Sequence, residues 1–159
     1  MRSYGVTRII DLRWQSEALK YPSPLSGDHR YRLVPACFDP TGDEEIPLDS
    51  YRLMADASRE RVAAVLTAIA EAPPGGIVVH CHAGRDRTGL VTGPALPVAG
   101  ATRESIVADY VLSDDSSSAT IVNTFAHFET RYGGVTEYLA GSGVTPAHLA
   151  AIRARLNEA

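Results

Sequence analysis

The stretch that decides the fold is IVVHCHAGRDRTG, residues 77–89. Its first four residues, IVVH (77–80), form a compact β-branched run that is typical of a buried strand. The chain breaker PPGG (73–76) precedes this run, and CHAGRDRTG (81–89), rich in charged residues and glycine, follows it. The pattern predicts a strand that ends at a tight loop, from which a helix begins.

The residues before this stretch predict a mostly parallel sheet. TRIIDL (7–12) is typical of a buried strand, YRLVPA (31–36) of a weaker one, and SRERVAAVLTAIAEA (58–72) of an amphipathic helix. The predicted helix carries four apolar residues on one face: Val62, Val65, Leu66 and Ile69. Strand, long loop, helix and strand in this order indicate the βαβ unit of a parallel sheet.

The C-terminal half is predicted to be helical. The predicted helices cover residues 102–113, 118–132, 135–140 and 146–159. Gly133 suits a helix C-cap, and Thr145 suits an N-cap because Pro146 follows it at the first helical position. In the apolar segment after the loop, Pro94 and Pro97 should kink or shorten any helix, since each lacks the amide donor that a helix interior uses.

Composition narrows the class of protein. The 159 residues suit a single domain, 1–159, with 45% hydrophobic and 21% charged residues. A net charge of −4 gives no basic footprint for nucleic acid. The start of the chain has no signal-peptide pattern and no apolar run is long enough to span a bilayer, so we expect a cytoplasmic protein without membrane insertion. Its oligomeric state stays open.

The cysteines are too few for a disulfide framework. Cys37 and Cys81 are the two cysteines of the chain, and neither has the spacing of a metal-ligand motif. We therefore expect neither a metal nor another cofactor. Cys37, at the end of a weak strand, is interpreted as a small buried residue, with a redox role opposite Cys81 as the alternative.

The loop carries the chemistry. A strand-to-helix junction presents free backbone N–H groups and the positive end of the helix dipole, which together favour an anion. Gly84 and Gly89 permit the tight backbone path that turns amides inward, and Arg87 offers a planar fork that matches two phosphate oxygens. Cys81 lies at the base of this cradle, where positive charge favours its thiolate. A thiolate next to a bound phosphate is a nucleophile for phosphoryl transfer.

The loop matches the HCx₅R signature of the protein-tyrosine phosphatase superfamily. HCHAGRDRTG (80–89) resembles the HCxAGKDRTG form of bacterial tyrosine/serine phosphatases, which are also similar to phosphoinositide phosphatases. GVTRIIDLR (5–13), followed by Glu17, is similar to the "DLRxxxE" element of that branch. IVADYVLSDD (106–115) and RYGGVTEYLAGSGVTPAHLAAIRARL (131–156) resemble its C-terminal helices. The resemblance implies an α/β fold with three α/β/α layers, a small mostly parallel sheet flanked by helices, and a helical C-terminal half.

Two positions depart from the family pattern. Members usually carry a segment with an "NxRDLGG"-like element before the first strand, and here the chain starts almost at GVTRIIDLR. The loop lysine is replaced by Arg85, which keeps the charge on a larger group. The first departure affects the shape expected for one wall of the substrate pocket, and the second affects the substrate preference expected from the resemblance.

Each loop residue receives a role. Cys81 is the predicted nucleophile and Arg87 the residue that binds the phosphoryl oxygens and stabilises the transition state. By resemblance, the Thr88 hydroxyl assists the thiolate, although capping of the next helix is compatible with that role. The predicted phosphate-binding residues are His82, Ala83, Gly84 and Arg85, and those that support the loop are His80 and Gly89. Three charged residues near the first strand are interpreted as a structural ion-pair group: Asp11, Arg13 and Glu17.

The general acid has two candidates. Asp86 lies in the loop itself, and the resemblance favours it because it is the aspartate of the KDRTG-type motif. Asp39, in CFDP (37–40), is the alternative, at the position of the mobile flap of other tyrosine phosphatases. Four acidic residues nearby are less favoured candidates for the same role: Asp43, Glu44, Glu45 and Asp49.

These residues predict a phosphate-monoester hydrolase that works through a phosphocysteine intermediate. Its partners would be a phosphorylated protein, lipid or small molecule. A phosphatase of a phosphoinositide or of a phosphorylated metabolite, with the same mechanism, is the alternative. An inactive phosphate-binding module is a further rival, although such modules generally lose the nucleophile or the arginine.

Overall fold

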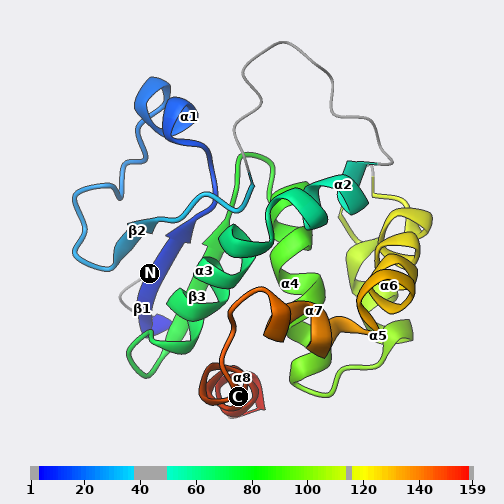
Figure 1. Cartoon of the computed structure of the whole chain (residues 1–159). Coiled ribbons are helices and arrows are strands. Elements are labelled where there is room, and N and C mark those ends of the chain that lie inside the picture. The colour runs from blue at the N-terminus through cyan, green and yellow to red at the C-terminus, as the bar shows by residue number, and fades with distance from the viewer. Residues whose placement is uncertain (1–3, 38–49, 114–115, 158–159) are drawn as a thin grey trace.

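The computed structural model of the chain describes residues 4–37, 50–113 and 116–157 (Figure 1). Within these residues three strands form one sheet: β1 (Val6–Asp11), β2 (Tyr31–Leu33) and β3 (Gly76–His80). The strand order is β2-β1-β3 and both pairings are parallel. This confirms the parallel βαβ arrangement that the sequence predicts.

Eight helices lie within the described residues. They are α1 (Gln15–Lys20), α2 (Ser50–Ala57), α3 (Arg59–Ala70), α4 (Asp86–Val98), α5 (Arg103–Tyr110), α6 (Ser118–Tyr132), α7 (Val135–Gly141) and α8 (Pro146–Asn157). The helix predicted over residues 58–72 and the four predicted in the C-terminal half are present with small shifts of their ends. The α/β class is confirmed, and the arrangement is consistent with the three-layer fold that the resemblance implies.

Three elements differ from the sequence-based expectation. α1 and α2 were not predicted, because six and eight residues are too few for a clear helical period. β2 ends at Leu33 rather than at residue 36. Pro35 has no amide to donate. Beyond Leu33 the amide of Val34 donates to the carbonyl of Asp11 in β1 at 2.9 Å, and that of Ala36 to the carbonyl of Leu12, just after β1, at 3.3 Å.

The two prolines do not cut the helix short, and the kink expected as the other outcome stays a prediction. α4 runs without interruption from Asp86 to Val98 and includes both Pro94 and Pro97. Each proline removes one hydrogen bond, but most α4 residues are buried and the helix packs against α2, α3, α5, α7 and α8. Burial of an apolar helix on several sides offsets a proline cost of about 3 kcal/mol.

The two predicted helix caps are confirmed. Gly133 ends α6 in the left-handed conformation, with φ 86°, and its amide and that of Gly134 donate to carbonyls of the last α6 turn. The hydroxyl of Thr145 accepts a hydrogen bond from the amide of His148 in the first turn of α8, at 3.2 Å.

The sheet positions the loop by burying its central strand. Ile9 and Ile10 of β1 point to opposite faces and both are fully buried, and Ile10 belongs to the main core with Leu66 of α3 and Leu90 of α4. Figure 1 shows α1 and the turn into α4 at the same end of the sheet, beyond the arrowheads of the strands. Because β1 and β3 are neighbours and parallel, the segments that follow them meet at this end.

Candidate active site

The loop after β3 leads directly into α4. β3 ends at His80 and α4 begins at Asp86, so residues 81–85 form the whole connection. Gly84 has a φ of 74°, in the left-handed region that residues with a side chain rarely adopt. Its amide donates a hydrogen bond to Sγ of Cys81 at 3.2 Å. The structure therefore places Gly84 where the loop turns around the thiol.

Cys81 is a buried thiol whose pKa is lowered by its surroundings. Its exposed fraction is only 6%. Burial alone raises the pKa of a thiol, but Thr88, the amide of Gly84 and the charge of Arg87 outweigh it and hold the pKa of Cys81 below its ordinary value. The Thr88 oxygen is itself buried and makes no full hydrogen bond within the described residues, so its hydroxyl proton is available to a thiolate.

Arg87 is held by the segment that follows β1. Its side chain is only 11% exposed, and both of its terminal nitrogens donate to the carboxylate of Glu17, with 3.0 Å between Nη2 and Oε1. The guanidinium also lies over the indole ring of Trp14, 4.4 Å from the ring centroid. Within the described residues these contacts use two of its five N–H donors, which leaves three for a bound anion.

Glu17, which the sequence grouped with Asp11 and Arg13 as a structural ion-pair group, contacts the loop instead. The predicted structural ion pair exists between Asp11 and Arg13, which are both buried and 2.7 Å apart. Glu17 pairs with Arg87 instead. Burial alone raises the pKa of Glu17, but Arg87 and the amide of Trp14 lower it below its ordinary value, so the pair is ionised near neutral pH. The glutamate of the "DLRxxxE" element was the sequence signal that pointed to this position.

Asp86 is supported from the opposite side. Its Oδ1 accepts a hydrogen bond of 2.6 Å from the Tyr51 hydroxyl, which in turn accepts one of 3.0 Å from Tyr110. Nε of Arg85 lies 3.3 Å from both carboxylate oxygens, and the Asp86 side chain is 44% exposed. Tyr51 and Tyr110 were missed by the sequence analysis, because no local pattern connects them to the loop. Asp39, the alternative acid, lies outside the described residues, as do the four less favoured candidates, Asp43, Glu44, Glu45 and Asp49.

The other loop residues divide into an inner and an outer group. His80 donates from Nδ1 to the carbonyl of Cys81 at 3.0 Å, since that oxygen can only accept, and its Nε2 lies 3.9 Å from the buried carboxylate of Asp11. This places His80 beneath the loop. His82 and Ala83 are exposed and lie on the outer side, and the partly exposed Arg85 side chain contacts the part-exposed Asp86.

Gly89 has a different purpose from the one predicted. It lies inside α4 and not in the turn, so it does not shape the backbone path of the loop. A Cβ atom at this position would lie 2.9 Å from Cε2 of Tyr110. Gly89 thus allows Tyr110 to pack directly against the first turns of α4.

Cys37 is a buried free thiol that contacts Trp14, the residue whose ring lies against Arg87. It is 1% exposed, and the indole N–H of Trp14 donates to its Sγ at 3.3 Å. Burial raises the pKa of Cys37, which makes it a poor nucleophile. The structural interpretation fits this environment, and the redox alternative stays a prediction.

The described residues contain neither a metal-binding cluster nor a membrane-spanning helix. Among them, no group of three or more His, Cys, Asp and Glu side chains is arranged to hold a metal ion. Also within these residues, no helix has the length and apolar character needed to cross a membrane.

Comparison with known proteins agrees with the geometry of the loop. A family model described as "Tyrosine phosphatase family" matches residues 1–158. The chain therefore belongs to the tyrosine phosphatase family.

Two curated relatives show how far the similarity reaches. The chain is 29% identical over 125 residues to a "Tyrosine-protein phosphatase" of Nostoc commune, a match that covers 71% of this chain and 42% of the relative. It is 46% identical over 52 residues to the "Triple specificity protein phosphatase PtpB" of Mycobacterium tuberculosis, covering 33% of this chain and 18% of the relative. Each match spans less than half of the relative's length.

Proposed function

We propose that this protein hydrolyses phosphate monoesters through a phosphocysteine intermediate on Cys81. The observation that carries the proposal is the environment of this thiol. A buried cysteine ordinarily has a raised pKa, whereas the pKa of Cys81 is lowered by Thr88, Gly84 and Arg87, all of which belong to one loop and the helix that it begins. The same groups that stabilise a thiolate also suit the oxygens of a phosphoryl group.

The first half-reaction transfers the phosphoryl group to sulfur. The Cys81 thiolate attacks phosphorus, an S–P bond forms, and the P–O bond to the leaving group breaks. Arg87 and the inward-facing loop amides stabilise the negative charge on the phosphoryl oxygens. In this proposal Asp86 gives its proton to the leaving oxygen, with Asp39 as the alternative donor.

The second half-reaction restores the enzyme. The Asp86 carboxylate, which lost its proton in the first step, takes a proton from water as the water oxygen attacks phosphorus. The S–P bond breaks, the sulfur leaves as a thiolate, and inorganic phosphate is released. The Thr88 hydroxyl donates to the departing sulfur. A reducing cytoplasm, the location expected from the sequence, keeps this thiol available.

Phosphorylated protein side chains are the first substrate class in this proposal, because both curated relatives are named as protein phosphatases. One observation favours a second class. His82 is exposed and Arg85 partly so, and they add two basic side chains at the solvent-accessible edge of the loop. A phosphoinositide or a phosphorylated metabolite with a further anionic group fits such an edge. Turnover of a panel of phosphopeptides, inositol phosphates and phosphorylated metabolites distinguishes the two classes.

The proposal is tested with Cys81→Ser. We expect the wild type to hydrolyse an aryl phosphate without added metal, and Cys81→Ser to lose turnover while it still binds vanadate or phosphate. Rapid quenching of the wild type with labelled substrate should trap a phosphate group on Cys81. Residual turnover above about one-hundredth of wild type would contradict the covalent mechanism, because loss of a nucleophile normally costs far more.

A further inference from the structure

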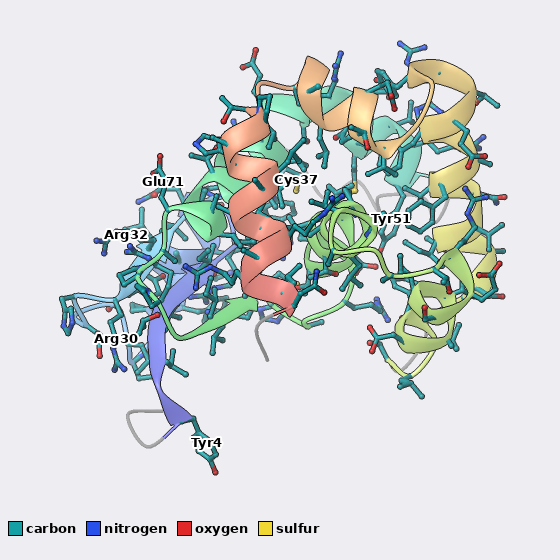
Figure 2. All side chains as sticks on the ribbon, turned by 90° about the horizontal axis from the view of Figure 1, so that it is seen from below. Tyr4, Arg30, Arg32, Cys37, Tyr51 and Glu71 are labelled. Atoms are coloured by element: carbon teal, nitrogen blue, oxygen red, sulfur yellow. The ribbon has the colours of Figure 1, made fainter. Side chains whose placement is uncertain are left out.

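The hydroxyl chain behind Asp86 joins three parts of the fold. Tyr51 comes from α2 and is 5% exposed, so it is a core residue with a single polar atom. That atom donates to Oδ1 of Asp86 at 2.6 Å and accepts from the Tyr110 hydroxyl of α5 at 3.0 Å. Figure 2 shows Tyr51 next to α4, which is seen along its axis.

The chain of hydrogen bonds has one direction. Burial, followed by the contacts with Asp86 and Tyr110, raises the pKa of Tyr51 far above its ordinary value, so its hydroxyl keeps its proton. A tyrosine has one proton to give, and a carboxylate can only accept. Tyr110 therefore donates to Tyr51, and Tyr51 donates to Oδ1 of Asp86. The protonated form of Asp86 that keeps both of these hydrogen bonds carries its proton on Oδ2.

The packing of α5 against α4 holds this chain in place. A Cβ atom at residue 89 would lie 2.9 Å from Cε2 of Tyr110, closer than side-chain atoms pack. A glycine at this position therefore lets the Tyr110 ring come this close to α4. Gly89 is three residues after Asp86 on the same helix, hence on the same side of its first turn. Gly89, the last residue of the loop motif, thereby allows the Tyr110 hydroxyl to reach that of Tyr51.

We propose that Tyr51, oriented by Tyr110, is a positioning residue that fixes the side chain of Asp86 and directs its proton to Oδ2. The inference rests on the proposed function and on Asp86 as the proton donor. Among the residues that the structure describes, Tyr51 from α2 and Arg85 from the loop face Asp86. The neighbouring Arg87 is turned to Glu17.

The structure offers a matched control for the test. Tyr132 of α6 donates to Oδ1 of Asp56 at 2.5 Å, and Asp56 lies on α2, the same helix as Tyr51. Tyr132→Phe thus removes the same type of bond from the same helix without touching Asp86. Tyr51→Phe and Tyr110→Phe remove the inner and the outer donor of the proposed chain.

The experiment measures kcat/KM with two substrates, an alkyl phosphate and an aryl phosphate with an acidic phenol. We expect Tyr51→Phe to lower kcat/KM about tenfold for the alkyl phosphate and to leave the aryl phosphate nearly unchanged, because only the alkoxide needs a well-placed proton. Tyr110→Phe should give a smaller change in the same direction, and Tyr132→Phe none.

A double-mutant cycle separates positioning from a merely structural effect. Tyr51→Phe should cost nothing further once Asp86→Asn is present, because the two residues act as one unit. An equal loss with both substrates, or a full further loss on top of Asp86→Asn, would overturn the inference while the proposed function stands. Should Tyr51→Phe fail to fold, Tyr110→Phe decides by the same two criteria. An inactive wild type would overturn the proposed function and this inference together.

Discussion

Asp86 and Arg87 are consecutive residues, yet different parts of the molecule hold them. Glu17 and Trp14, which follow β1, hold Arg87, whereas Tyr51 and Tyr110, from α2 and α5, hold Asp86. Figure 1 shows α1 and α2 on either side of the start of α4. The Arg87 side chain is 11% exposed and that of Asp86 44%.

The chemistry of the two supports differs as well. Arg87 carries a permanent charge in a nearly buried position, and such a charge requires a counter-ion and well-formed hydrogen bonds. Asp86 must gain and lose a proton in the proposed reaction. The cationic Arg85 also lies 3.3 Å from Asp86, but its side chain is about one-third exposed, so solvent screens its charge. The buried group that holds Asp86 is a neutral hydroxyl, that of Tyr51. The comparison teaches that each support suits the charge behaviour of the residue that it holds.

The largest effect is expected at Asp86, with alkyl phosphates as substrates. Asp86→Asn should lower kcat/KM by about 10²–10⁴ for these poor leaving groups and nearly spare aryl phosphates with an acidic phenol. The measurement is the slope of log(kcat/KM) against the pKa of the leaving group, after circular dichroism has shown that the variant is folded. Asp39→Asn should leave the slope unchanged. A steeper slope for Asp39→Asn alone would move the acid to the segment after β2.

A large effect is also expected at Arg87, and with every substrate. Arg87→Lys should be nearly as damaging as Arg87→Ala, with a loss of about 10²–10³ in kcat/KM. An ammonium group keeps the charge, but it cannot pair with both Glu17 oxygens and still present a planar fork to phosphate. Turnover and vanadate affinity of both variants check this. If Arg87→Lys kept most of the activity, Arg87 would act as a point charge. Its pairing with Glu17 would then not matter for catalysis in the way that the pairing of Tyr51 with Asp86 is proposed to.

A smaller effect is expected at Glu17. Glu17→Gln keeps the shape but removes the charge that orients Arg87, so kcat/KM should fall about tenfold, the value of a hydrogen bond to a charged group. The loss should appear in KM and in phosphate affinity, with no change in the dependence on leaving group. Asp28→Asn is a matched control, because Asp28 pairs with Arg30 at 2.6 Å outside the site. A steeper leaving-group slope for Glu17→Gln would mean that the two supports are not independent.

Much of the framework could be predicted from the sequence because its signals are local. The run 77–80 and the breaker before it define β3, and Gly133 and Thr145 mark helix ends through bonds to residues a few positions away. The continuity of α4 was not predictable in this way. Its prolines carry a local signal to kink or stop, and the helix continues through them because it packs against five helices: α2, α3, α5, α7 and α8.

By itself the sequence determined the thiol at Cys81, the arginine at Arg87 and the glycine turn between a strand and a helix, because these groups are neighbours in the chain. Only the tertiary structure decided what holds them. Glu17 reaches Arg87 across 70 residues, and Tyr51 reaches Asp86 across 35. Whether such side chains meet depends on the parallel pairing of β1 with β3 and on the packing of α2 and α5 against α4. Those contacts arise when distant segments bury their apolar faces together, which no short stretch of the sequence encodes.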